Sequence, residues 1–297
     1  MTIFYIHIGK IPFHLKLSLN QAIKHHPESN CVLLTDCPTF KLKGLQIVDI
    51  NKYTKSANEF SRYYKHMSSN SFKFELICFQ RWFILKDFVN NNNVNETFMY
   101  LDSDVLVYQD LFNVIDLEGY KMTVTKGYGP QYSIFKNPSS LNHFCDFILN
   151  NYANKEKRNI LIDNYKINFL DKNIKGGICD MTLLGLYNFE GNCKDIFRIS
   201  NYYFNSTLSN IRKDAKDLGY SADDFNLQNF FSNSPCPKWK DIKIGALHFQ
   251  GSSKAQIHCY YKGRNKYCYY MIGELYLFLN TFKRRLKSKV NRFKFFN

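Results

Sequence analysis

Two carboxylates interrupt an apolar stretch in the middle of the sequence. Asp102 and Asp104 follow the run TFMYL at residues 97–101 and precede the run VLV at residues 105–107. An ionised carboxylate beside an apolar strand is costly unless something pairs with it. Residues two apart on a strand point to one face, and hard oxygen ligands suit Mg²⁺ or Mn²⁺. The pair therefore predicts a site for a divalent cation, with an Asx turn at the strand end as the alternative.

A second polar segment follows an apolar run near residue 250, in the sequence LHFQGSSK at residues 247–254. His248 is a candidate third metal ligand, and the alternative is a simple hydrogen bond at the end of a strand. Gly251 permits close approach of the backbone to a phosphate. Lys254 offers a point charge to the same group.

Two further charged residues lie in stretches that are otherwise apolar. Arg81 lies within CFQRWF at residues 78–83, and a buried guanidinium needs an anion. That anion is either a structural carboxylate or a phosphate or carboxylate of the site. Asp180 follows the glycine pair at 176–177 and begins a helical pattern, so it either caps the helix or belongs to the site.

The surrounding pattern alternates strands with helices, which predicts a mostly parallel sheet with helices on both sides. Continuous apolar runs suit strands that are buried on both faces. The segment 154–175 is expected to be an irregular charged connection. The predicted strands are 2–8, 31–35, 45–50, 97–107 (one strand through the two carboxylates), 122–125 and 242–249, and the predicted helices are 13–26, 72–89, 139–151 and 176–186.

Length and composition exclude several classes of protein. With 297 residues and 17% aromatic residues, the chain can bury enough apolar surface to fold, so disorder is excluded. We expect one domain over residues 1–265 and a basic amphipathic helical tail over 266–297. The nine cysteines form no paired metal spacing, which indicates reduced thiols in a cytosolic protein. The first residues do not resemble a signal peptide, and the apolar stretch 267–282 is shorter than a membrane span.

The charge is distributed unevenly along the sequence. The formal net charge is +15, and residues 282–297 contain seven Lys and Arg and no Asp or Glu. Phe, Leu and Val alternate with these cations, a basic amphipathic pattern. We therefore expect the tail to attach a cytoplasmic protein to an anionic membrane surface on the cytosolic face. The alternative is a helical face that packs on the domain.

The segments TFMYLDSDVLVYQDL (97–111) and LHFQGSSK (247–254) together resemble the metal-dependent glycosyltransferases of the GT-A fold. They are most similar to the family-eight type, which includes glycogenin-like and lipooligosaccharide galactosyltransferase-like enzymes. The resemblance covers roughly residues 1–262 and implies a single Rossmann-like α/β domain. It also implies roles for single residues. Asp102, Asp104 and His248 would bind Mn²⁺ (or Mg²⁺), and Ser103, Gly251 and Lys254 would contact the nucleotide diphosphate. Arg81 would lie near the phosphates and Asp180, and His7 would lie near the base.

The resemblance further implies a nucleotide-sugar donor, with UDP-glucose or UDP-galactose expected, and a glycan, lipid or protein acceptor. It favours retention over inversion at the sugar. Met181 stands where the family usually has Gln. Two other functions remain open from the residues: a basic nucleic-acid-binding protein or metal-dependent nuclease, and a sugar-binding module without catalysis. The first needs cations spread along a groove, whereas half of the excess here lies in the tail, so we expect no nucleic acid partner.

Overall fold

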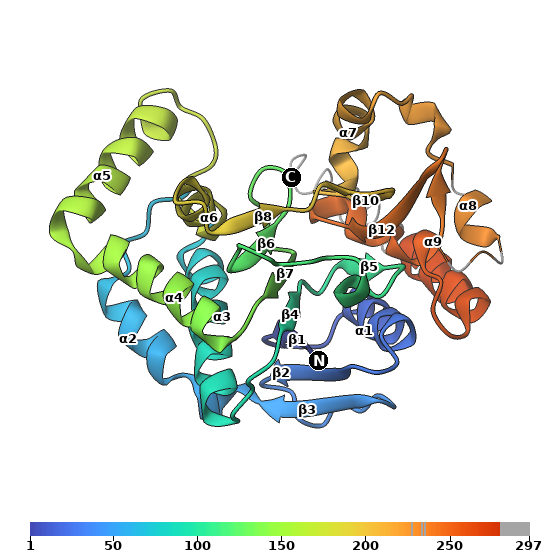
Figure 1. The fold of residues 1–297 in the computed structure, drawn as a ribbon, viewed down its shortest axis with the longest axis horizontal. Helices are drawn as coiled ribbons and strands as arrows, with labels where there is room; N and C mark the ends of the chain where they lie inside the picture. Colours follow the sequence, from blue (N-terminus) through green and yellow to red (C-terminus); the bar gives the residue numbers. More distant parts are fainter. Residues whose placement is uncertain (227, 233, 235, 280–297) are drawn as a thin grey trace, which may run out of the picture.

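A seven-stranded, mostly parallel sheet forms the centre of the structure (Figure 1), a computed structural model that describes residues 1–226, 228–232, 234 and 236–279. The strand order is β3-β2-β1-β4-β7-β6-β8. Strands β3, β2, β1 and β4 run parallel, whereas β7 is antiparallel to both neighbours. The strands are β1 (Thr2–His7), β2 (Asn30–Thr35), β3 (Leu45–Asp49), β4 (Phe98–Leu101), β6 (Met122–Val124), β7 (Tyr132–Phe135) and β8 (Cys193–Asp195).

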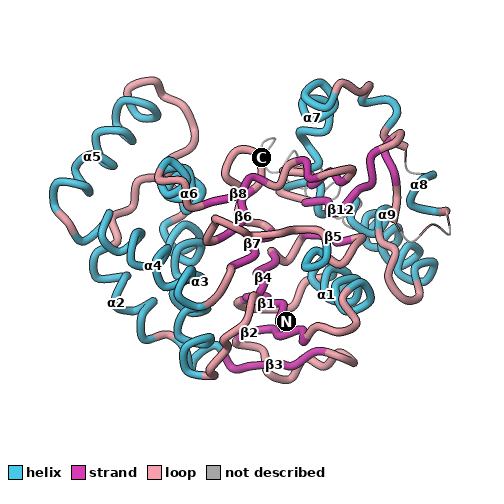
Figure 2. The backbone as a smooth tube through the Cα atoms, in the orientation of Figure 1, coloured by secondary structure: helices cyan, strands magenta, loops and turns pink. Residues whose placement is uncertain are grey.

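Helices cover both faces of this sheet (Figure 2). Alternate residues of β1 face opposite sides: Phe4 packs in one apolar cluster with Trp82, and Ile3 packs in another with Leu15. The first cluster joins the sheet to α2, α3 and α4, and the second joins it to α1. The helices of this part are α1 (Phe13–His25), α2 (Lys55–Tyr63), α3 (Phe72–Asn91), α4 (Pro138–Ala153), α5 (Lys155–Tyr165) and α6 (Asp180–Phe189).

A smaller sheet lies beside the first, and its longest strand is β12. Strand β5 pairs with β12 in antiparallel register, so the chain passes from the large sheet into the small one between β4 and β5. Trp239 lies in the apolar cluster of this second unit. The remaining elements are β5 (Val105–Val107), β9 (Arg198–Ile199), β10 (Tyr202–Phe204), β11 (Lys238–Trp239), β12 (Ile242–His248), α7 (Ile211–Leu218), α8 (Gln228–Phe231) and α9 (Ile257–Tyr260).

The predicted fold class, an α/β domain with a mostly parallel sheet between helices, is confirmed. Three details of the prediction were wrong. Residues 97–107 form two strands in different sheets, because the chain turns at 102–104. Strand β3 is at the edge of its sheet and is only partly buried. Segment 154–175 is largely helical, and the Asn154 side chain caps α5 by accepting a hydrogen bond from Lys157 N at 3.1 Å.

Only the beginning of the predicted tail lies within the described residues. Residues 266–279 are helical and pack on the domain through aromatic contacts. The ring of Tyr269 lies 5.4 Å from that of Tyr261, and the ring of Tyr276 lies 6.3 Å from that of Phe13. The seven cations predicted to meet a membrane lie beyond residue 279, outside the described part. Within that part, no helix combines the length and the apolar composition needed to cross a bilayer.

Candidate active site

The crossing between the two sheets brings the two predicted motifs together. In the antiparallel pair of β5 and β12, His248 is the register partner of Val105. Phe249 N donates a hydrogen bond to the backbone oxygen of Asp104 at 2.9 Å. As a result, His248 Nε2 lies 3.5 Å from Asp104 Oδ1, although the two residues are far apart in the sequence.

Asp102, Asp104 and His248 form a cluster that fits a divalent metal ion. One ligand atom from each of the three side chains lies within 4.8 Å of the others. The carboxylates converge because they flank a turn at Ser103, and not because they share one face of a strand as predicted. Two carboxylates and one imidazole form a hard donor set of the kind that Mn²⁺ and Mg²⁺ accept.

A hydrogen bond to the backbone fixes the orientation of the His248 ring. Its Nδ1 donates a hydrogen bond to the carbonyl oxygen of Ser206 at 2.7 Å, so Nε2 faces the carboxylates. Burial lowers the pKa of His248, but the hydrogen bond and the charge of Asp104 outweigh burial and raise it. No sequence pattern indicated Ser206, because its contribution is a carbonyl that any residue type supplies.

Lys254 lies at the same cluster. It belongs to a short 3-10 helix, Gly251–Gln256, and its Nζ is 3.0 Å from Asp104 Oδ2. Burial raises the pKa of Asp104, but His248 and Lys254 together bring it below its ordinary value. Gly251 begins this 3-10 helix with φ +64°, and a Cβ added there would meet nothing within 4 Å. The segment therefore carries an ammonium and an open, left-handed glycine beside the metal ligands.

Arg81 joins the metal-ligand cluster to Asp180. Its Nη1 lies 2.6 Å from Asp102 Oδ1, and its Nη2 pairs with Asp180 Oδ2. The hydroxyl of Tyr100 donates to Asp102 Oδ1 at 2.7 Å and accepts from Arg81 Nη1 at 3.1 Å. The indole Nε1 of Trp82 donates to Asp180 Oδ2 at 3.2 Å. The buried guanidinium is thus paired with two carboxylates of the chain itself.

Asp180 is the first residue of α6, and its side chain is only 5% exposed. The residue before the helix is Cys179, whose backbone N–H donates to Thr182 Oγ1 at 3.2 Å. The carboxylate of Asp180 instead turns to Arg81 and Trp82. The glycine pair has a packing role, because a Cβ on Gly177 would lie 2.3 Å from the backbone oxygen of Met67.

Two further histidines, His7 and His14, lie near this region: the charges of Lys254, Asp104 and His7 all act on His14. His7 ends β1, and among the described residues its ring nitrogen Nε2 is hydrogen-bonded to Lys10 O at 3.2 Å, not to the metal-ligand cluster. His14, which the sequence did not single out, has its pKa lowered to about 4 by burial and then by the positive charge of Lys254. His14 is therefore a neutral hydrogen-bonding group at neutral pH.

No protein-family model and no curated protein sequence matches this chain. Solved structures that are similar to it are glycosyltransferases, as the sequence resemblance predicted. The galactosyltransferase LgtC, in complex with donor and acceptor sugar analogues, is 13% identical over 92% of this chain and 95% of its own, with a TM-score of 0.48. GlyE of Streptococcus pneumoniae is 15% identical over 92% of this chain but only 59% of its own, with a TM-score of 0.44. A glycosyltransferase involved in glycosylation of the major capsid of PBCV-1 is 12% identical over 86% of this chain and 95% of its own, with a TM-score of 0.44.

We predict that Arg81→Leu destabilises the protein by about 3–5 kcal/mol, because it leaves the carboxylate of Asp180 buried without its cation. The double variant Arg81→Leu with Asp180→Asn should recover part of this loss, since Asp180 then carries no uncompensated charge. Urea denaturation of the wild type, both single variants and the double variant measures the coupling between the two residues. Strictly additive effects would show that the pair contributes no interaction energy.

Proposed function

We propose that this chain is a nucleotide-sugar-dependent glycosyltransferase of the GT-A type that uses Mn²⁺ (or Mg²⁺). The donor is a UDP-sugar, UDP-glucose or UDP-galactose, and the acceptor is a glycan, a lipid-linked sugar or a protein. One observation carries the proposal: two distant segments bring Asp102, Asp104 and His248 together, with Lys254 beside them. Arg81 then links this metal-ligand cluster to the buried carboxylate of Asp180.

Cleavage of the bond between a sugar and a diphosphate develops negative charge on the departing nucleotide. A metal ion held by Asp102, Asp104 and His248 supplies Lewis-acid stabilisation of that charge. Lys254 adds a fixed cation, and its half-exposed side chain remains accessible to a ligand. Because the diphosphate leaves as a stabilised anion, the leaving side requires no general acid.

On the sugar side, Asp180 supplies a negative charge. Both the guanidinium of Arg81 and the indole of Trp82 hold its Oδ2, so the carboxylate is held in one place. A carboxylate held in this way suits electrostatic stabilisation of an oxocarbenium-like centre in a retaining reaction. Deprotonation of an acceptor hydroxyl in an inverting reaction would need a freer base. Arg81 acts here as a positioning residue between the two halves of the site.

We also propose that the protein binds an anionic membrane surface peripherally, from the cytoplasm. The helical residues 266–279 expose a row of apolar side chains: Met271 is 72% exposed, Leu275 58% and Phe278 68%. These residues are spaced four and three apart, so they share one face of the helix. The seven cations of residues 282–297 follow directly in the sequence. Each cation close to such a surface is worth about 1 kcal/mol.

The metal prediction uses Asp104→Asn, which removes one charge of the cluster and keeps the shape of the side chain. In the wild type, a UDP-sugar with Mn²⁺ at about 100 times its dissociation constant should add about 2.7 kcal/mol to the unfolding free energy. The variant should lose this Mn²⁺-dependent stabilisation in thermal-shift and calorimetric titrations. Asp146→Asn, at an exposed ion pair with Lys86, is the matched control. If Asp104→Asn kept the Mn²⁺-dependent stabilisation of the wild type, Asp104 would not be a metal ligand.

The lysine prediction concerns the rate of the chemical step. Lys254→Ala should lower kcat by about 10²-fold or more, the usual loss for one fixed group that stabilises developing charge. The KM for the acceptor should change little, because Lys254 faces Asp104. Steady-state kinetics with the cognate donor test this, with the exposed Lys52→Ala as control. An unchanged kcat would show that Lys254 takes no part in the chemical step.

The membrane prediction concerns the last residues of the sequence. Deletion of residues 282–297 should release the protein from anionic liposomes and preserve hydrolysis of the donor, because the candidate site residues all precede residue 255. Attachment of the full chain should weaken at about 0.5 M salt, where the screening length is well below about 8 Å.

Sedimentation with liposomes and binding to single-stranded DNA are compared side by side, because nucleic-acid binding follows the same salt trend. Sedimentation of the truncated chain with liposomes would contradict the membrane role of the tail. Preference of the full chain for DNA would contradict it equally.

A further inference from the structure

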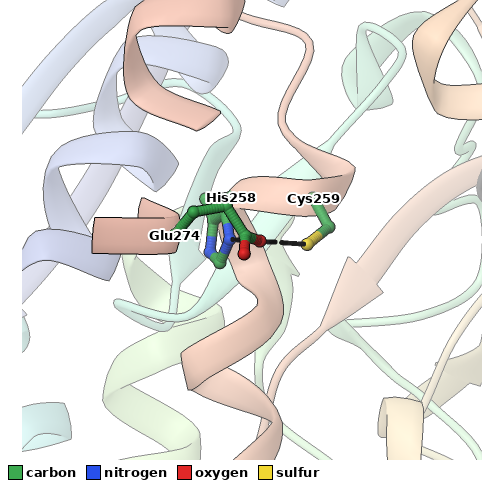
Figure 3. Close-up of side chains that lie close together, drawn as sticks. All are labelled: His258, Cys259 and Glu274. Atoms are coloured by element: carbon green, nitrogen blue, oxygen red, sulfur yellow. Dashed lines mark hydrogen bonds and ion pairs between the residues drawn. The ribbon is translucent and has the colours of Figure 1, made fainter. Parts of the chain in front are cut away.

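A second group of side chains that could bind a metal ion is separate from Asp102, Asp104 and His248, and Figure 3 shows how its three members lie. His258 and Cys259 belong to α9, and Glu274 belongs to the helical residues 266–279. His258 Nε2 is 2.9 Å from Glu274 Oε1, and Cys259 Sγ is 3.5 Å from His258 Nε2. Cys259 Sγ is 4.0 Å from Glu274 Oε1. A nitrogen, a sulfur and an oxygen thus form one small triangle.

The size of this triangle matches a tetrahedral zinc site. Zinc bonds of about 2.3 Å to sulfur and about 2.0–2.2 Å to nitrogen and oxygen place tetrahedral ligands about 3.4–3.6 Å apart. The three observed separations differ from those values by about 0.5 Å or less. Side-chain rotation alone covers such a difference, so no rearrangement of the backbone is needed to admit the ion.

The donor set differs in kind from that of the active site. A thiolate and an imidazole with one carboxylate select borderline metals such as Zn²⁺, whereas two carboxylates with one imidazole suit Mn²⁺ or Mg²⁺. The two clusters are therefore matched to different ions. The side chain of His258 is 1% exposed and that of Glu274 is 50% exposed, so the triangle opens to solvent on the side of Glu274. A water molecule can complete the fourth position there.

The packing of the two helices is adapted to this contact. A Cβ on Gly273 would lie 2.2 Å from Cγ of His258. Only glycine lets the helix approach the imidazole this closely, and the close approach places Glu274, the next residue, within reach of His258 and Cys259. Tyr270, which belongs to the same helix as Gly273 and Glu274, also packs on the imidazole: its ring lies 5.6 Å from that of His258.

We propose that His258, Cys259 and Glu274 bind one Zn²⁺ ion, with water as the fourth ligand. On binding, the thiol of Cys259 loses its proton to solvent and the thiolate bonds to the metal. The ion would fasten the helix of residues 266–279 to α9. This proposal does not depend on the glycosyltransferase activity. Without metal, the same three groups are joined by the His258–Glu274 ion pair and by the contacts of the Cys259 sulfur with both.

The test uses the full chain, stripped of metal and kept reduced, with Zn²⁺ or Co²⁺ as the probe. Titration with Co²⁺ should give the absorption band of a cobalt–thiolate bond, and Zn²⁺ should displace it. Cys259→Ser should abolish the band, and Glu274→Gln should weaken Zn²⁺ binding by at least about 100-fold, since even outer-shell changes cost about 10–100-fold. Glu274→Gln keeps the shape and a hydrogen bond at a half-exposed position, so the variant remains folded.

Two controls separate this site from the rest of the chain. Cys268→Ser changes an exposed thiol on the same helix, and Asp104→Asn changes the other cluster. Both should keep the thiolate band and the Zn²⁺ affinity. Absence of the band in the wild type would overturn the proposal, as would a band that Cys268→Ser abolishes and Cys259→Ser does not. Zinc binding that only Asp104→Asn removes would place the ion in the active site and would also overturn it.

Discussion

The candidate site depends on one buried guanidinium. Arg81 pairs with Asp102 through Nη1 and with Asp180 through Nη2, and its side chain is 14% exposed. A buried cation is tolerable only when anions compensate it, and buried anions need a cation in turn. The three groups therefore require one another. Because Arg81 belongs to α3, Asp102 follows β4 and Asp180 begins α6, this requirement fixes three separate elements around one centre.

A second constraint is the passage of the chain from one sheet to the other. Strand β4 ends in the core of the large sheet, and three residues later β5 pairs with β12 of the small sheet. The two ends of the turn at 102–104 are held by different sheets: Asp102 N donates to Gln131 O at 2.9 Å, and Asp104 O accepts from Phe249 N at 2.9 Å. His248 arrives because β12 runs antiparallel to β5 and ends beside the turn. The metal-ligand cluster is thus a consequence of topology as much as of the motif.

The sequence predicted most of the elements and the membership of the site, but not how the site is built. Apolar spacing located α1 and α3, and β-branched and aromatic residues located β1. Such patterns failed at β5, which is too short for a pattern and is defined only by its distant partner β12. Residue types revealed Arg81 and Asp180 as charges in apolar surroundings, yet their direct pairing, and the donors Tyr100 and Trp82, depend on tertiary contacts that no local pattern records.

The pairing of Lys254 with Asp104 bears on how a ligand is received. Without a nucleotide, the lysine neutralises part of the charge on the two carboxylates, which would otherwise repel one another in a poorly solvated turn. In the proposed glycosyltransferase, a divalent cation held by Asp102, Asp104 and His248 would take over that compensation, and the ammonium of Lys254 would be free to pair with phosphate oxygens of the donor. Under that proposal the charge of the two carboxylates would be compensated both with and without the donor. Lys254 would then serve two purposes: it pairs with Asp104 in this structure, and it would stabilise the charge that develops on a departing nucleotide.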